Sequence, residues 1–196
     1  MSIHDEGYIK FNCKLSEKKI FVPDDILIKI NYWRNRFKLF RMIGVLDNGI
    51  GFGNISYNIN GEKFYISGSS TGDVSELTNY HIAKVTFCNV EKNLVECEGK
   101  INASSESLSH YSIYKSSIGA KAVIHIHCKH LWNKYMNKLP TTAPDAYFGS
   151  VELANELKRL SKNTTSNIII AAGHEDGIFS YAESIDKAAE NLLRLY

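Results

Sequence analysis

The sequence predicts an α/β protein in which helices cover both faces of a central, largely antiparallel sheet, a three-layer α/β/α arrangement. Strand-like and helix-like segments are mixed along the chain without the strict alternation typical of a parallel sheet. Asn60-Gly61 between two strand-like runs is the strongest hairpin signal, and two segments have the apolar spacing of helices. With 196 residues and no repeat or low-complexity linker, we expect one domain over residues 1–196.

The first helix is expected from Pro23 to about Met42. Its apolar residues recur at spacings of three and four, which places them on one helix face. They are Ile26, Ile30, Trp33, Phe37 and Phe40, and the basic residues between them are Lys29, Arg34, Arg36, Lys38 and Arg41. We interpret the basic residues as a solvated face, with a surface for an anionic ligand or a partner as the alternative.

Four strands are expected after a glycine-rich segment at 48–54. Residues 55–59 and 62–67 form the hairpin, and residues 81–90 and 93–98 form a second strand pair. Residues 67–72 between the two pairs are all small, so we expect a loop there.

The second half of the chain continues this mixture. Ser104 or Ser105 is a natural N-cap for a helix that runs to about Ser117. The remaining elements are expected to be a strand at 120–127, a helix at 151–160, strands at 167–172 and 178–182, and a closing helix from Ser184 with Ile185, Ala188, Ala189, Leu192 and Leu193 on its inner face.

Composition indicates a soluble globular protein without nucleic acid or membrane as a partner. The chain is 44% hydrophobic and 22% charged, with a net charge of only +2. No apolar run approaches the roughly 18–20 residues of a membrane span, and no signal peptide is visible. The four cysteines form no Cys-x-x-Cys pair, which favours a reducing, cytoplasmic location.

The pair His125 and His127, in the strand expected at 120–127, is the first candidate for chemistry. Side chains two residues apart on a strand leave the same face, so the two imidazoles are expected to lie together. Such a pair can chelate a divalent ion, or it can be two histidines on a polar face. The residues alone leave both interpretations open.

Two further signals are weak when taken alone. Glu106 and His110 are four residues apart and share a helix face, which is also the pattern of an ordinary solvated contact. His174 follows Gly173 in a turn between two expected strands, where a side chain can project into a cleft or simply be exposed.

An ordered set of short motifs connects these signals. From about Gly44 onward they are Gly53-Asn54-Ile55-Ser56, the loop at 67–72, Ala103-Ser104-Ser105-Glu106 with His110 and Tyr114, residues 122–127, residues 148–154, and Gly173-His174. In order and approximate spacing they resemble the class II aldolase/adducin family, which includes fuculose-phosphate aldolase and methylthioribulose-phosphate dehydratase.

The resemblance implies a divalent metal ion on His125, His127 and His174, either Zn²⁺ or another first-row ion such as Mn²⁺, Fe²⁺ or Co²⁺. It also implies that Glu106 is the catalytic acid/base. Three protein ligands leave coordination positions open, as in catalytic rather than structural sites. An ion in such a site polarises a substrate carbonyl and favours an enediolate, and a nearby carboxylate can move the proton.

By the same resemblance, five residues bind the phosphate of a sugar phosphate: Asn54, Thr71, Gly72, Ser104 and Ser105. Backbone N–H groups at a glycine turn and at a helix start are common anion donors, and hydroxyls add to them. A plain surface turn is the alternative for residues 67–72. Simple capping at Ser104-Ser105 is compatible with phosphate binding.

We therefore expect a metal-dependent lyase that acts on a small phosphorylated sugar by aldol cleavage or dehydration. The alternatives are a non-catalytic, adducin-like assembly module and a metal-dependent epimerase or decarboxylase. Family members commonly form cyclic tetramers, so we expect a homotetramer. The segment between His127 and His174 is shorter than in the aldolases and has no clear counterpart of their catalytic tyrosine, for which Tyr135 is the nearest candidate.

Overall fold

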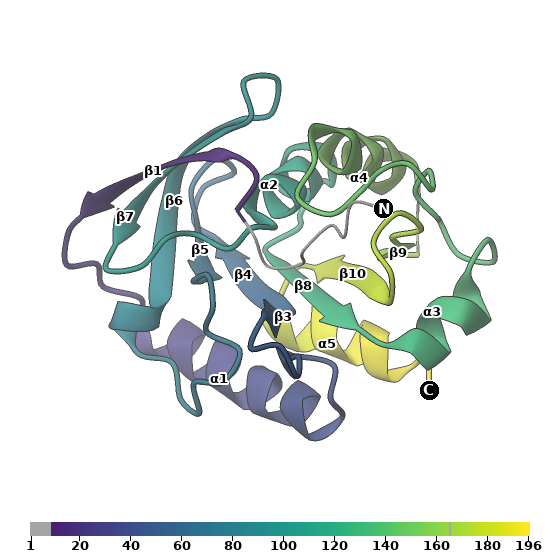
Figure 1. The fold of residues 1–196 in the computed structure, drawn as a ribbon, viewed down its shortest axis with the longest axis horizontal. Helices are drawn as coiled ribbons and strands as arrows, with labels where there is room; N and C mark the ends of the chain where they lie inside the picture. Colours follow the sequence, from purple (N-terminus) through teal and green to yellow (C-terminus); the bar gives the residue numbers. More distant parts are fainter. Residues whose placement is uncertain (1–8, 165) are drawn as a thin grey trace.

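The computed structural model describes residues 9–164 and 166–196, in which five α-helices cover an eight-stranded sheet (Figure 1). The helices are α1 (Asp24–Leu39), α2 (Ser107–Ser116), α3 (Lys129–Tyr135), α4 (Val151–Asn163) and α5 (Ile185–Leu193). The strands of this sheet are β1 (Asn12–Glu17), β4 (Asn54–Asn58), β5 (Phe64–Ser67), β6 (Ile82–Asn89), β7 (Leu94–Gly99), β8 (Ala122–His127), β9 (Ile168–Ile170) and β10 (Gly177–Ala182). A separate ribbon consists of β2 (Gly44–Val45) and β3 (Gly51–Phe52), and Asn79–His81 form a short 3-10 helix.

The strand order of the large sheet is β1-β7-β6-β5-β4-β8-β10-β9. Within the described residues, β1 and β7 form its one parallel pair, and all other neighbours are antiparallel. Strand β8 therefore lies near the middle of the sheet, between β4 and β10, where both of its edges are paired.

Each face of the sheet has its own hydrophobic core. Helices α1 and α5 cover one face, and α2 and α4 cover the other (Figure 1). Because alternate residues of a strand point to opposite faces, Ile124 and Ile126 enter the core beneath α1 and α5, whereas Val123 enters the core beneath α2 and α4. His125 and His127 have the parity of Val123 and so face the α2 and α4 layer. The expected α/β fold, with three layers and a largely antiparallel sheet, is confirmed.

Most expected elements are present, with shifted ends. The hairpin of β4 and β5 turns at Gly61, whose φ of +86° suits glycine. Its loop is longer than a two-residue turn, because the N–H of Ile59 donates to the carbonyl of Lys63. The closing helix begins after Ser184, as expected, and the Ser184 side chain accepts a hydrogen bond from the N–H of Lys187.

The expected start of α2 was wrong. The helix begins at Ser107 with Glu106 at the N-cap, so Ser104 and Ser105 lie in the turn that precedes it. The carbonyl of Ser104 accepts from the N–H of Ser107, and its hydroxyl accepts from the N–H of Glu106. The other shifts are an earlier end of α1 and a longer α4. The sequence also did not indicate strand β1, the β2–β3 ribbon or helix α3. None of the described helices is long and apolar enough to cross a membrane.

Candidate metal centre

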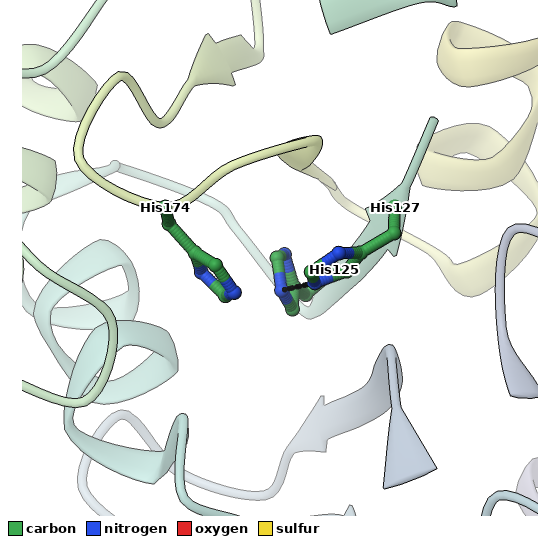
Figure 2. Close-up of side chains that lie close together, drawn as sticks. All are labelled: His125, His127 and His174. Atoms are coloured by element: carbon green, nitrogen blue, oxygen red, sulfur yellow. Dashed lines mark hydrogen bonds between the residues drawn. The ribbon is translucent and has the colours of Figure 1, made fainter. Parts of the chain in front are cut away.

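Three histidines from two segments meet at one end of β8 (Figure 2). His125 and His127 leave the same face of the strand, and His174 comes from the turn between β9 and β10. The antiparallel register pairs Gly177 with His127, which places that turn beside the end of β8. The nearest ligand nitrogens of the three imidazoles all lie within 4.8 Å of one another.

Hydrogen bonding and packing fix the ring of His125. Its Nδ1 lies 3.2 Å from the carbonyl oxygen of Ile178, which makes Nδ1 the protonated nitrogen and leaves a lone pair on Nε2. That Nε2 lies 3.2 Å from Nε2 of His127. The ring of Phe179, the register partner of His125 on β10, stacks on the imidazole at a centroid distance of 4.3 Å.

The electrostatic environment of His125 favours the neutral imidazole. Burial, together with the nearby rings of His174 and His127, holds the pKa of His125 well below its usual value. A neutral imidazole is the form that binds a metal ion. Three imidazole nitrogens so close together suit zinc or another late first-row ion better than Mg²⁺ or Ca²⁺, so the cluster fits a divalent transition metal.

Glu106 lies directly beside this cluster. Its side chain is 3% exposed, and Oε1 lies 3.6 Å from Nδ1 of His174. The hydroxyl of Ser109, one helical turn further along α2, donates to Oε2 at 2.6 Å. Within the described part of the chain, Oε1 accepts no hydrogen bond. One carboxylate oxygen is therefore held in place, and the other remains available to a proton or to a ligand.

A polar cleft continues from the histidines to the small-residue loop. It is lined by the five expected phosphate-binding residues, Asn54, Thr71, Gly72, Ser104 and Ser105, together with Glu106, His125 and His174. All the predicted catalytic, anion-binding and metal-binding residues except His127 thus line one hollow, and His127 joins them through the histidine cluster.

The hydrogen bonds of this cleft show which groups can donate to an anion. Nδ2 of Asn54 donates to Oγ of Ser104 at 3.0 Å and has a second hydrogen. Oγ of Ser104 also accepts from the N–H of Glu106, so its own hydroxyl hydrogen is free to point elsewhere. The hydroxyl of Thr71 donates to the carbonyl of Gly68 at 2.9 Å. At Thr71, the backbone rather than the hydroxyl is therefore the better anion donor.

Gly72 is at the point where the loop contacts the β2–β3 ribbon. A Cβ at this position would lie 2.0 Å from the carbonyl oxygen of Gly44. A side chain would therefore push the loop out of the cleft wall, and glycine is required here by close backbone contact.

Sequence reasoning did not single out Ser109 or Phe179, because their roles depend on which strand and helix turn lie opposite them. Tyr135, the nearest candidate for a catalytic tyrosine, does not line the described cleft. Its hydroxyl donates to the carbonyl of Leu195 at 2.9 Å, on the α1 and α5 side of the sheet. Tyr114 is buried in the core beneath α2 and α4, with its hydroxyl 2.6 Å from Oγ of Ser56, and burial raises its pKa.

Comparisons with known proteins agree with this fold. The family model for the class II aldolase and adducin N-terminal domain matches residues 45–195. L-fuculose-1-phosphate aldolase from Thermus thermophilus has a TM-score of 0.64 at 18% identity, over 87% of this chain and 88% of that chain. YgbL from Escherichia coli has a TM-score of 0.66 at 17% identity, over 87% of this chain and 84% of that chain.

YgbL from Klebsiella pneumoniae is similarly close, with a TM-score of 0.64 at 16% identity over 90% of this chain and 87% of that chain. No curated protein sequence matched the chain. At these identities the solved structures support the fold, and the family model identifies the family. The chain belongs to the class II aldolase and adducin family.

Proposed function

We propose that the protein is a divalent-metal-dependent lyase that acts on a small phosphorylated sugar by aldol cleavage or dehydration. The observation that carries this proposal is the position of the three-histidine cluster at a cleft of potential anion donors, with Glu106 lining the same cleft 3.6 Å from His174. A metal-chelating end and an anion-binding end in one hollow suit a substrate that has both a carbonyl–hydroxyl unit and a phosphate.

The relatives support the same substrate class. L-fuculose-1-phosphate aldolase, one of the similar structures, is named for a phosphorylated sugar. For YgbL, aldolase, epimerase and decarboxylase activities have been suggested, so the structural relatives include more than one reaction type. We place this chain with the lyases because Glu106 is the carboxylate that lines the described cleft, and one such base can take the hydroxyl proton in cleavage or the proton beside the carbonyl in dehydration.

In the proposed mechanism, His125, His127 and His174 hold the ion, which when bound polarises the substrate carbonyl. Asn54, Ser104 and the backbone at Thr71 and Gly72 bind the phosphate and so fix the substrate relative to Glu106.

In cleavage, Oε1 of Glu106 takes the proton of the substrate hydroxyl as the adjacent carbon–carbon bond breaks, and then gives that proton to the carbon released from the bond. In dehydration, it takes the proton from the carbon beside the carbonyl and gives it to the hydroxyl that leaves as water. Ser109 holds Oε2 meanwhile, so that the carboxylate does not rotate away from the reacting carbon.

We also propose that the protein acts as a homotetramer, as is common in the family, in the cytoplasm. Several large apolar side chains on and beside α1 are exposed and offer an assembly surface: Ile28, Tyr32, Leu39, Phe40 and Tyr196. An adducin-like module without catalysis would not require three clustered imidazoles and a buried carboxylate, and the presence of this set favours the enzyme.

The test is a screen of the metal-loaded protein against a panel of sugar phosphates, each paired with its unphosphorylated sugar. We expect turnover of a phosphorylated member, loss of turnover with a chelator, and recovery with added Zn²⁺ or another first-row ion. The appearance of an aldehyde product or of a dehydrated ketone separates cleavage from dehydration. Equal turnover of phosphorylated and unphosphorylated partners, or no turnover of any sugar phosphate, contradicts the proposal.

A further inference from the structure

Arg34 of α1 is buried, against the expectation of a solvated basic face. It is 2% exposed, whereas Arg36 on the same helix is exposed. Its Nη1 donates to the carbonyl of Val74, and its Nη2 donates to the carbonyls of Thr71 and Gly72, the latter at 3.1 Å. All its acceptors are thus backbone oxygens of the loop that lines the cleft.

The charge of Arg34 has no ion-pair partner among the described residues. Burial lowers its pKa, and only Asp73 acts in the opposite direction. An arginine guanidinium nevertheless remains charged in proteins. The five cleft residues expected to bind phosphate are all neutral, so Arg34 is a buried positive charge held directly behind a neutral anion-binding wall.

The bonds of Arg34 also set the direction of two peptide groups. In a trans peptide the carbonyl and the N–H point in opposite directions, and there is no cis peptide in the described chain. With the carbonyls of Thr71 and Gly72 turned toward Arg34, the N–H groups of Gly72 and Asp73 point away from it. In the described part of the chain, no hydrogen bond uses either of these N–H groups.

We propose that Arg34 is a positioning residue of the anion subsite. It holds the loop at 71–74 with the N–H of Gly72 directed into the cleft, and its charge strengthens this N–H as a donor to a phosphate. The inference rests on the proposed function, which places the phosphate at this loop. The residue lies on α1, outside the segment 45–195 that matches the family model.

The experiment compares wild type with Arg34→Gln, Arg34→Lys and, as a matched control, Arg36→Gln, which removes the same charge from an exposed site on the same helix. Two quantities are measured on the metal-loaded proteins. One is the dissociation constant of inorganic phosphate, and the other is the amide hydrogen exchange of residues 68–74 without ligand. Circular dichroism and metal content verify that each variant is folded and loaded.

We expect Arg34→Gln to weaken phosphate binding about tenfold or more, the size of a lost interaction with a charged group, and to speed exchange in the loop. Arg34→Lys keeps the charge but lacks the planar fork that reaches three carbonyls. It should therefore recover part of the affinity while loop exchange stays fast. Arg36→Gln should match wild type in both measurements.

The two possible failures can be told apart. Unchanged phosphate affinity and unchanged loop exchange in Arg34→Gln overturn the role of Arg34 and leave the phosphate site intact. A wild-type protein that binds no phosphate contradicts the proposed function and, with it, the effect of Arg34 on anion affinity. For a substrate found in the screen, a rise in KM with kcat nearly constant supports positioning of the anion, whereas a fall in kcat alone contradicts it.

Discussion

Asn54 and His125 are register partners on the adjacent antiparallel strands β4 and β8. Directly opposite residues in such a pair have Cα atoms about 5 Å apart, and both side chains face the α2 and α4 layer. One residue belongs to the anion cleft and the other to the histidine cluster. The proposed metal-binding and phosphate-binding ends of the site are therefore fixed close together on the central sheet, which favours a substrate with few bonds between its phosphate and its chelating oxygens.

Replacing Asn54 tests this arrangement. Asn54→Ala removes a proposed donor to the phosphate and is expected to raise KM for a phosphorylated substrate about tenfold to a hundredfold, because hydrogen bonds to charged groups contribute about 1.5–3 kcal/mol. Metal content should not change. Asn58→Ala, at the other end of β4 where Oδ1 accepts from the N–H of Gly61, is the control. A drop in kcat with KM unchanged would show that Asn54 acts on the chemical step instead.

Glu106→Gln separates metal binding from proton transfer. The amide is nearly the same size as the carboxylate but cannot take the proton, so kcat should fall about a hundredfold to ten-thousandfold while the ion is retained. Ser109→Ala, which removes the hydrogen bond to Oε2, should cause a smaller fall. Normal turnover by Glu106→Gln, measured with a substrate from the screen, excludes Glu106 as the acid/base.

Gly72→Ala tests the close contact that shapes the loop. The new Cβ would collide with the carbonyl of Gly44, so we expect a loss of about 1–3 kcal/mol in the free energy of unfolding and weaker phosphate binding. Gly61→Ala is the control, because its Cβ would have nothing within 4 Å and only the positive φ causes strain. Urea unfolding of both variants gives the comparison. If Gly61→Ala weakens phosphate binding as much as Gly72→Ala does, the weaker binding does not come from the contact between Gly72 and Gly44.

Buried histidines should make the metal-free protein less stable in mild acid. Burial lowers the pKa of His110 to about 3, compared with about 6.5 in an unfolded chain. Between these values only the unfolded chain binds the proton, so the stabilisation is complete above about pH 6.5 and decreases as the pH falls below it.

The decrease should be about 1.4 kcal/mol per pH unit for each such histidine. Urea unfolding of the chelator-treated protein between pH 7.5 and 5 measures it, and His110→Gln should reduce the slope. Equal stability across this range contradicts the assignment of a neutral, buried His110.

The fold was largely predictable from the sequence because the spacing of apolar residues indicates which face of a helix or strand is buried. Spacings of three and four identified α1 and α5, and Asn60-Gly61 located the hairpin. Strand β1 was missed because only Cys13 and Leu15 are apolar in it and its partner β7 is more than 70 residues away. The start of α2 was misplaced because Ser104 and Ser105 are both common N-cap residues. In the structure these two serines lie in a turn, and the helix begins only after it, at Ser107.

The candidate site was predictable only where local geometry determines it. His125 and His127 share a face because strand side chains alternate, and this can be read from two residues. Their proximity to His174 depends on the register of β8 and β10, and the sequence supported it only through family resemblance. The burial of Arg34 depends on a loop some forty residues further along the chain, so helix periodicity could not distinguish it from its solvated neighbours.

The most direct test of the metal centre is the metal content of the purified protein after equilibration with Zn²⁺. We expect one tightly bound ion per chain in wild type and in His130→Ala, which changes an exposed histidine near the cluster. The double variant His125→Ala/His127→Ala should lose that ion. A wild-type protein without a stoichiometric ion, or a double variant that binds zinc as tightly as wild type does, would contradict the assignment of His125, His127 and His174 as a metal centre.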